Sequence, residues 1–268
     1  MVLYIRILII FLILFLILLY IIHLNEIKIK INILEESFKN NTNNERYTAI
    51  IIEPRPHKAL EYVLENFMEN LSNNWDFIIF HGNLNKNYII NILNSNFLLK
   101  ENINRIKLIN LNIDNLTIKD YNDLLVSKDL YKNIHSEIFL IFQTDSIICK
   151  KNKDLINYFL KYDYTGAPWK DKTVGNGGLS LRRKSKMLEI IDNCPYTNQP
   201  EDVYFGKACS EIFRNIPDFE NAKEFSVETV YNDKSFGVHK PWIHLKRDSY
   251  INKVNNCDGL DKLRELNK

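Results

Sequence analysis

The chain has 268 residues, of which 46% are apolar, so it is long enough for one sizeable domain with its own core. Its formal net charge is +2. This near balance disfavours a nucleic-acid-binding protein, which usually carries a strong basic excess or basic patches.

The N-terminus contains an uncharged apolar run from residue 7 to residue 22. A membrane-spanning helix needs about 20 mostly apolar residues. A cleaved signal peptide is the alternative, but no small-residue cleavage site follows the run. The sequence therefore predicts a transmembrane anchor in residues 1–24, a polar stem in 25–45 and one folded domain in 46–268.

The orientation of this anchor stays open. Arg6 lies on its N-terminal side, and Lys28 and Lys30 lie just beyond it, which slightly favours a cytoplasmic C-terminal side. Large C-terminal domains can nevertheless be translocated despite such charges.

Strand and helix patterns alternate through the first half of the domain. Apolar runs predict strands at 47–52, 77–81, 105–111 and 138–142, and helical spacing predicts helices at 57–71, 88–93, 121–134 (two short ones) and 154–162. The strands are continuously apolar, as in mostly parallel sheets with helices on both faces. Residues 47 to about 165 therefore read as a Rossmann-like α/β half.

The second half is more irregular. A glycine-rich loop leads into a strand-like stretch that ends near Arg183, and helices are predicted at 185–191 and 201–213. The four cysteines form no C-x-x-C pair, which disfavours a zinc or thioredoxin-type site. If the domain is lumenal, Cys149, Cys194, Cys209 and Cys257 could form two disulfides in any of three connectivities; unpaired thiols are the alternative.

Three polar residues, Glu53, His81 and Asp145, follow predicted strands, and open α/β sheets bind ligands outside the carboxyl ends of their strands. Capping and turn formation explain Glu53 and His81 adequately. Asp145 follows the most apolar strand, where a charge is costly unless it is hydrated, paired or bound to a metal.

The stretch VGNGGLSLRR, residues 174–183, concentrates glycine, which lets the backbone approach a ligand closely. It contains no GK[ST], so it is not a Walker loop. Further on, Glu201 and Asp202 follow Pro200 at a predicted helix start, where they serve either as helix-capping acids or as a source of a general base.

Together these segments resemble GT-A-type glycosyltransferases, most closely a poorly characterised glycosyltransferase-like family catalogued as a domain of unknown function. The matching segments are IIIEPRPH, NW with FIIFHG, YNDLLVS, IFLIFQTDSIIC, YDYTGAPW, VGNGGLSLRRKSKML, EDVYF, FSVET and GVHKPW. They span roughly residues 50 to 242, and the later ones are the more specific. The fold implied is a GT-A-like mixed, mostly parallel sheet flanked by helices.

The resemblance implies a divalent cation, Mn²⁺ or Mg²⁺, on the diphosphate of a nucleotide-sugar. GT-A enzymes hold it with an Asp-x-Asp motif, and here Asp145 inherits the second acid while Gln143 replaces the first. A late histidine, His239, would be a further ligand. The replacement by Gln143 puts metal affinity in doubt.

The resemblance also implies roles for other residues. The acid pair Glu201 and Asp202 would supply the base that deprotonates the acceptor hydroxyl, with Asp202 favoured. The remaining nucleotide-sugar-binding candidates are Glu53, Arg55, Asn176, Gly177, Gly178 and Trp169.

The function implied is that of a membrane-anchored glycosyltransferase acting on a glycan, protein or lipid hydroxyl, with its domain lumenal in a Golgi- or ER-like membrane if the host is eukaryotic. A carboxylate base facing away from the leaving group would give inversion; retention stays open. The alternative is a catalytically degenerate, glycan-binding or assembly protein. A phosphotransferase is weakened by the missing Walker lysine.

Overall fold

In the computed structural model, residues 45–207 and 210–268 are described. The anchor predicted for residues 1–24 and, except for Glu45, the stem predicted for 25–45 lie outside them. Within the described residues, no helix combines the length and the apolar character needed to cross a membrane.

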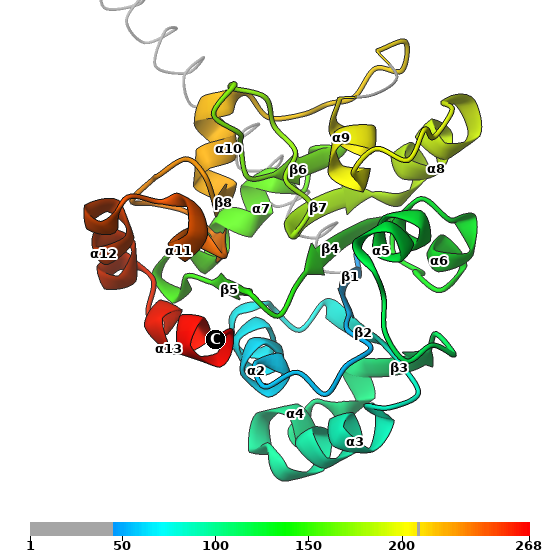
Figure 1. Ribbon diagram of the computed structural model, residues 1–268, viewed down its shortest axis with the longest axis vertical. Coiled ribbons are helices and arrows are strands. Elements are labelled where there is room, and N and C mark those ends of the chain that lie inside the picture. The colour runs from blue at the N-terminus through cyan, green and yellow to red at the C-terminus, as the bar shows by residue number, and fades with distance from the viewer. Residues whose placement is uncertain (1–44, 208–209) are drawn as a thin grey trace, which may run out of the picture. The chain divides into compact units, whose positions relative to one another are not determined.

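A six-stranded sheet in the order β3-β2-β1-β4-β7-β6 forms the centre of the fold (Figure 1). Its strands are β1 (Tyr47–Ile52), β2 (Trp75–His81), β3 (Ile106–Asn110), β4 (Ile138–Phe142), β6 (Tyr164–Gly166) and β7 (Leu179–Arg183). Strands β3, β2, β1 and β4 pair in parallel, whereas β7 runs antiparallel to both β4 and β6. The predicted mixed, mostly parallel sheet is confirmed.

Helices surround this sheet. They are α2 (Leu60–Asn70), α3 (Lys86–Ser95), α4 (Phe97–Glu101), α5 (Ile118–Leu125), α6 (Lys128–Lys132), α7 (Ile156–Phe159), α8 (Lys184–Asn193), α9 (Glu201–Gly206), α10 (Phe219–Phe225), α11 (Pro241–His244), α12 (Arg247–Asn256) and α13 (Leu260–Leu266), with 3-10 turns η1 (Ile103–Arg105) and η2 (Lys150–Leu155). The helix predicted for 201–213 is too long, because α9 ends at Gly206. The helix predicted for 154–162 is wrong in form, since η2 fills its first turn and α7 is a single turn.

Alternate side chains of the central strands enter two separate apolar cores. Ala49 and Ile51 of β1 pack on the face covered by α2, whereas Ile50 and Ile52 pack on the face covered by α5 and α6. Figure 1 shows these helices on opposite sides of the sheet. Burial on both faces explains why the strands are apolar at every position rather than at every second one.

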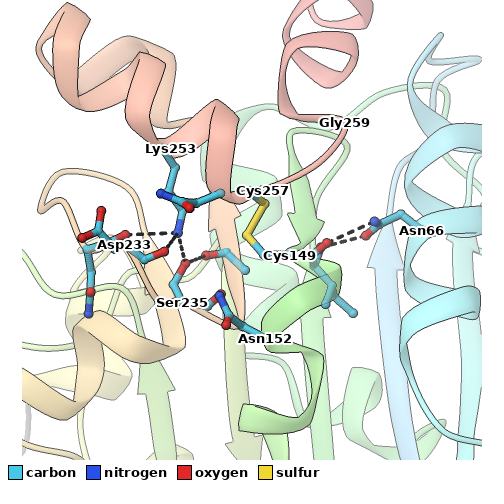
Figure 2. The surroundings of a disulfide bond; sticks show 12 residues. Asn66, Cys149, Asn152, Asp233, Ser235, Lys253, Cys257 and Gly259 are labelled. Atoms are coloured by element: carbon cyan, nitrogen blue, oxygen red, sulfur yellow. Dashed lines mark hydrogen bonds between the residues drawn. A yellow bond between two sulfur atoms is a disulfide. The ribbon is translucent and has the colours of Figure 1, made fainter.

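A second, three-stranded sheet in the order β5-β9-β8 was not predicted. Its strands, β5 (Ser146–Ile148), β8 (Ser226–Val227) and β9 (Gly237–His239), have two or three residues each. Runs this short carry too few residues to show an alternating pattern. The side chain of Asn66 on α2 completes the edge of this sheet, because it donates to the carbonyl of Ile148 and accepts from its N–H (Figure 2).

The C-terminal helices are tied to this small sheet at two points (Figure 2). A disulfide joins Cys149, directly after β5, to Cys257, directly after α12. Lys253 of α12 is fully buried and donates to the carbonyls of Asn232 and Asp233 and to Oγ of Ser235, in the loop before β9. Burial lowers the pKa of Lys253 to about 8, and the charge of Asp233 opposes that shift. The disulfide confirms one of the pairings that the sequence allowed.

We expect the double substitution Cys149→Ser with Cys257→Ser to lower the free energy of unfolding by about 2–4 kcal/mol, because the disulfide closes a long loop in the unfolded chain. Urea denaturation measures this loss. Each single substitution should give nearly the same loss, since either one breaks the bond. An unchanged denaturation midpoint in the double variant would contradict this role.

Candidate active site

A cleft of about 500 Å³ opens where β1 and β4 end. Its lining comes from the segments after those strands, the β3–α5 connection, the glycine loop, the start of α9, and the strands β8 and β9 where they end. This is the edge of the sheet where open α/β folds bind ligands. Of the predicted site residues, it brings together Glu53, Arg55, Asp145, Asn176, Gly177, Gly178, Glu201, Asp202 and His239.

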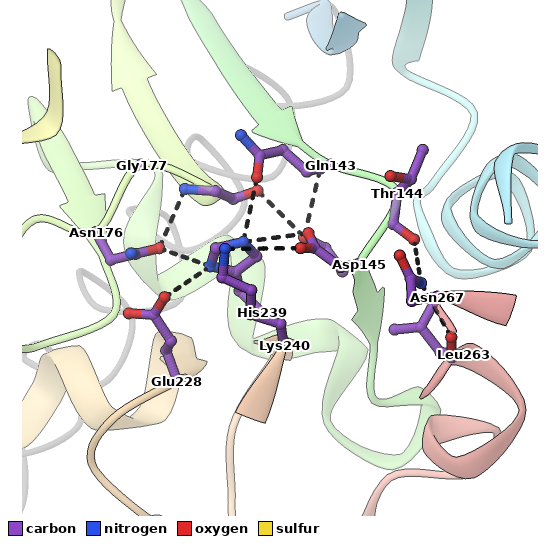
Figure 3. A network of polar contacts seen from close by, with 12 residues as sticks. Gln143, Thr144, Asp145, Asn176, Gly177, Glu228, His239, Lys240, Leu263 and Asn267 are labelled. Carbon is purple, nitrogen blue, oxygen red and sulfur yellow. Dashed lines mark hydrogen bonds and ion pairs between the residues drawn. The ribbon is translucent and has the colours of Figure 1, made fainter. Parts of the chain in front are cut away.

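His239 lies at the bottom of this cleft between two carboxylates (Figure 3). Its Nε2 is 3.1 Å from Oδ1 of Asp145, and its Nδ1 is 3.1 Å from Oε1 of Glu228. Two amides complete the contacts: Oε1 of Gln143 is 3.2 Å from Nε2, and Oδ1 of Asn176 is 3.0 Å from Nδ1. Every partner of the imidazole is therefore an oxygen.

The small sheet explains why these groups meet. In the antiparallel β5–β9 pair, His239 lies opposite Ser146, the neighbour of Asp145. In the parallel β8–β9 pair, Val227 lies opposite Val238, so Glu228 and His239 follow at matching positions. Three separate segments thus bring their polar residues to one end of one sheet.

The charges of this cluster stabilise one another. Burial by itself would lower the pKa of His239, but the charges of Asp145 and Glu228 outweigh it and raise the pKa to about 9. Burial likewise opposes ionisation of Asp145, but His239 and then Lys240 outweigh it, and the pKa of that carboxyl falls below its usual value. The cluster is therefore an imidazolium held by carboxylates at neutral pH.

The glycine loop packs directly against these groups. A Cβ on Gly178 would lie 2.2 Å from the ring of His239, and one on Gly177 would lie 2.0 Å from Oε1 of Glu201. Both positions require glycine for space. Asn176 holds the loop, because its Oδ1 accepts from the N–H of Gly178 as well as facing His239.

Glu201 forms a buried ion pair. Both of its oxygens accept hydrogen bonds from Arg182, at 2.7 and 3.0 Å, and Arg182 is completely buried. The guanidinium also lies over the rings of Tyr164 and Phe205. This pair fixes the start of α9 against β7.

Asp202, the next residue, faces the cleft. Its carboxylate accepts from the N–H of Gly177 at 3.2 Å and from that of Val203 at 2.8 Å. Burial and then the nearby charge of Glu201 raise the pKa of Asp202 to about 6, against the opposing effect of these bonds and of Arg182. A carboxylate with a pKa near 6 is suited to accept a proton at neutral pH.

Glu53 and Arg55 form an ion pair at the end of β1. Glu53 is buried and accepts from Nε of Arg55 at 2.8 Å and from Nη2 at 2.9 Å. Asn85 fixes this turn by donating to the carbonyls of both residues. About half of the Arg55 side chain stays exposed, so its charge reaches the cleft.

Trp169 does not line the cleft. Its ring lies under Nζ of Lys207 and against Gly175, behind the glycine loop.

His81 is buried, with Nδ1 2.8 Å from the carbonyl of Gly82, which agrees with its interpretation as a turn residue.

Sequence reasoning missed Glu228 and Lys240. Glu228 lies in the segment FSVET, but β8 has two residues and gives no strand signal. Lys240 follows His239 in a left-handed conformation, with φ of 30°, although Pro241 comes next. Its Nζ is 3.9 Å from Oδ2 of Asp145. Strained backbone of this kind clusters at functional sites.

The cluster at His239 offers two oxygens that suit a divalent cation, Oε1 of Gln143 and Oδ1 of Asp145, and a third atom, Nε2 of His239, that would coordinate once it has given up its proton. Oδ1 of Asp145 is buried and accepts no well-aligned hydrogen bond, although Nε2 lies 3.1 Å away. Within the described residues, no group of three or more His, Cys, Asp or Glu side chains is arranged for a metal. An amide oxygen would therefore supply the third donor, and with it the residues fit a hard cation.

Solved structures place this fold among glycosyltransferases. The glycosyltransferase GlyE of Streptococcus pneumoniae TIGR4 superposes with a TM-score of 0.50 at 11% identity, over 83% of this chain and 60% of GlyE. The galactosyltransferase LgtC, in complex with donor and acceptor sugar analogues, gives 0.49 at 12% identity over 82% and 94%. The mannosyltransferase PcManGT of Pyrobaculum calidifontis, in complex with GDP-Man and Mn²⁺, gives 0.45 at 11% over 60% and 50%. The chain has a GT-A-like glycosyltransferase fold.

A family model described as "Protein of unknown function (DUF5672)" matches residues 105–239. The chain belongs to this family. No curated protein matches it.

We expect Glu201→Gln to lower the free energy of unfolding by about 3–5 kcal/mol, because it leaves the buried charge of Arg182 unpaired. Urea denaturation measures the change. Asp129→Asn is the matched control, since its partner Lys132 is exposed, and it should leave the midpoint unchanged. Equal small effects of both substitutions would show that the Glu201–Arg182 pair is not structural.

Proposed function

We propose that this protein transfers a sugar from a nucleotide-sugar donor to a hydroxyl acceptor. The observation that carries the proposal is that Asp202, with its raised pKa, and the Asp145–His239 pair line one cleft at the carboxyl ends of β1 and β4. This reaction requires a base that accepts the proton of the acceptor hydroxyl and a group that binds the diphosphate of the donor.

Asp202 is the proposed base. In the reaction, the acceptor oxygen bonds to the anomeric carbon as the bond from that carbon to the diphosphate breaks, and the acceptor proton passes to Asp202. The N–H groups of Gly177 and Val203 orient the carboxylate. Attack opposite the leaving group would invert the anomeric centre. Glu201 receives a structural role in this proposal, because Arg182 engages both of its oxygens.

Gln143, Asp145 and His239 would hold a divalent cation, Mn²⁺ or Mg²⁺. When bound, the cation would offset the negative charge that develops on the diphosphate. The charge of the cleft favours a bound cation, because five acidic and three basic side chains line it. An anionic donor entering without a cation would meet a net negative surface. Gln143 is held for this role, since its Nε2 donates to Tyr121 and Oε1 is thereby turned toward His239.

Lys240 and Arg55 are the proposed protein cations beside the donor. Both line the cleft, and each is anchored by a carboxylate, Asp145 for Lys240 and Glu53 for Arg55. Asn176, Gly177 and Gly178 bring backbone close to the donor. Trp169 is dropped as a sugar-stacking residue, because it lies outside the cleft lining.

The proposed setting is lumenal, with the domain held at a membrane by the apolar N-terminal run. The Cys149–Cys257 disulfide supports an oxidising compartment. The acceptor would be a hydroxyl on a glycan, a protein or a lipid.

The competing proposal is a binding protein that no longer transfers sugar. Gln143 at the position of the first acid favours it, because the cation site would then hold a single carboxylate. The two proposals are separated by incubating the full-length protein with a panel of UDP- and GDP-sugars and Mn²⁺, and following hydrolysis and binding. Binding without turnover would support the binding protein, and neither binding nor turnover would refute both.

We expect Asp202→Asn to reduce transfer at least 100-fold while donor affinity measured by calorimetry stays within about threefold, because general base catalysis contributes on the order of 10²–10⁴-fold. Loss of donor binding in this variant would refute the base assignment.

The turnover rate of the unmodified protein should rise with pH through about 6, since Asp202 must be ionised to accept the proton. Below that pH, the rate should fall about tenfold per pH unit. The charged neighbours of Asp202 are Glu201 and Arg182, which form an ion pair with each other. A rate that is flat from pH 5 to pH 7 would exclude Asp202 as the base.

We expect Asp145→Ala to weaken the affinity for Mn²⁺ together with donor at least tenfold, because it removes the one carboxylate of the proposed cation site. Glu137→Ala is the control, since Glu137 is half exposed on the segment before β4 and outside the cleft lining. Equal metal-dependent affinities in both variants would overturn the ligand assignment.

A further inference from the structure

Glu228 is a buried residue of the cleft that has no role in the proposed reaction. It is buried, with 4% of its surface exposed, and lies on the side of His239 opposite Asp145 (Figure 3). Burying a carboxylate is costly unless it is paired. It pairs with Nδ1 of His239 at 3.1 Å, and Nε2 of His244 lies farther away, at 3.9 Å.

The hydrogen bonds around His239 determine which ring nitrogen faces the cleft. The N–H of Gly178 donates to Oδ1 of Asn176, so that oxygen, not the amide nitrogen, faces Nδ1. Glu228 also presents an oxygen to Nδ1. Nε2 likewise faces two oxygens, those of Asp145 and Gln143, so both nitrogens carry hydrogens in the imidazolium. In a neutral ring bound to a cation, the acceptors at Nδ1 would keep the hydrogen there, and Nε2 would be the nitrogen that coordinates.

The backbone makes this arrangement rigid. Glu228 and His239 occupy matching positions at the ends of the parallel strands β8 and β9. Gly178 packs against the His239 ring near its two nitrogens. The imidazole therefore has little freedom to rotate. Lys253, through its bonds to the loop before β9, and the neighbouring Cys149–Cys257 disulfide secure the same sheet from its outer side.

We propose that Glu228 is a positioning residue that fixes the Nδ1–H form of His239 and so presents Nε2 to a divalent cation. Carboxylates that accept from the far nitrogen of a metal-binding histidine orient the ring and raise its basicity. This inference rests on the proposed cation site, but it concerns a residue that would not touch cation or substrate.

The test compares Mn²⁺ binding by full-length protein in detergent, without donor, for Glu228→Ala, Glu228→Gln and the control Glu224→Ala. Glu224 lies four residues earlier on α10, is half-buried and does not line the cleft. Free Mn²⁺ is followed by its electron paramagnetic resonance signal. Pulsed spectra of bound Mn²⁺ show whether a histidine nitrogen is coordinated.

We expect Glu228→Ala to weaken Mn²⁺ binding 10–100-fold and to remove the histidine nitrogen signal. Glu228→Gln keeps an acceptor oxygen without the charge, so it should retain the nitrogen signal and bind with intermediate affinity. If Glu228→Ala does not fold, Glu228→Gln carries the test because it preserves shape. Glu224→Ala should match the unmodified protein in both readouts.

Unchanged affinity and an unchanged nitrogen signal in both Glu228 variants would overturn the inference while leaving the proposed glycosyltransferase intact. Absence of Mn²⁺ binding by the unmodified protein would overturn the inference and the cation site together. Nucleotide-sugar binding, measured in the same sample without metal, then shows whether the proposed donor site survives. The failures of the two proposals are therefore distinguishable.

Discussion

The candidate site depends on one constraint: a buried imidazole must be satisfied on both of its nitrogens. His239 meets it with Asp145 on one side and Glu228 on the other. Because Asp145 directly precedes β5, Glu228 directly follows β8 and His239 ends β9, the pairing requires the small sheet β5-β9-β8 to form. The position of Asp145 between β4 and β5, and hence the proposed diphosphate side of the cleft, follows from that requirement.

The opposite wall of the cleft is fixed by a second buried charge pair, Arg182 with Glu201. Arg182 is on β7 and Glu201 begins α9, so the pair joins the antiparallel strand of the sheet to the helix that bears Asp202. The glycine loop lies between the two charge clusters, since Gly177 donates to Asp202 and Gly178 packs against His239. This arrangement suits the proposed reaction, in which leaving-group stabilisation and proton removal are assigned to different residues.

Much of this arrangement could be predicted from sequence. Strands β1 and β4 are continuous apolar runs, and the charged residues Glu53 and Asp145 follow them directly or within three positions. The base candidate Asp202 and the glycine loop were likewise visible as local patterns. Glu228 was not, since its position beside His239 depends on a two-residue strand and on the register of that strand with β9. Trp169 could not be placed from sequence for a different reason: an aromatic residue near the glycine loop can lie on either side of it, and this one packs on Lys207 outside the cleft lining.

The disulfide between Cys149 and Cys257 has a consequence for the order in which the protein is completed. It joins residues 108 positions apart, and the second cysteine follows α12, so the small sheet gains this brace only after α12 has been synthesised. Contacts of such long sequence separation form slowly. The start of α9 with Asp202 precedes α12 in the chain, whereas the sheet that carries His239 gains this brace only when α12 is present and the two cysteines have been oxidised. Oxidation of Cys149 and Cys257 to one cystine is therefore a late step in securing the part of the cleft that holds His239.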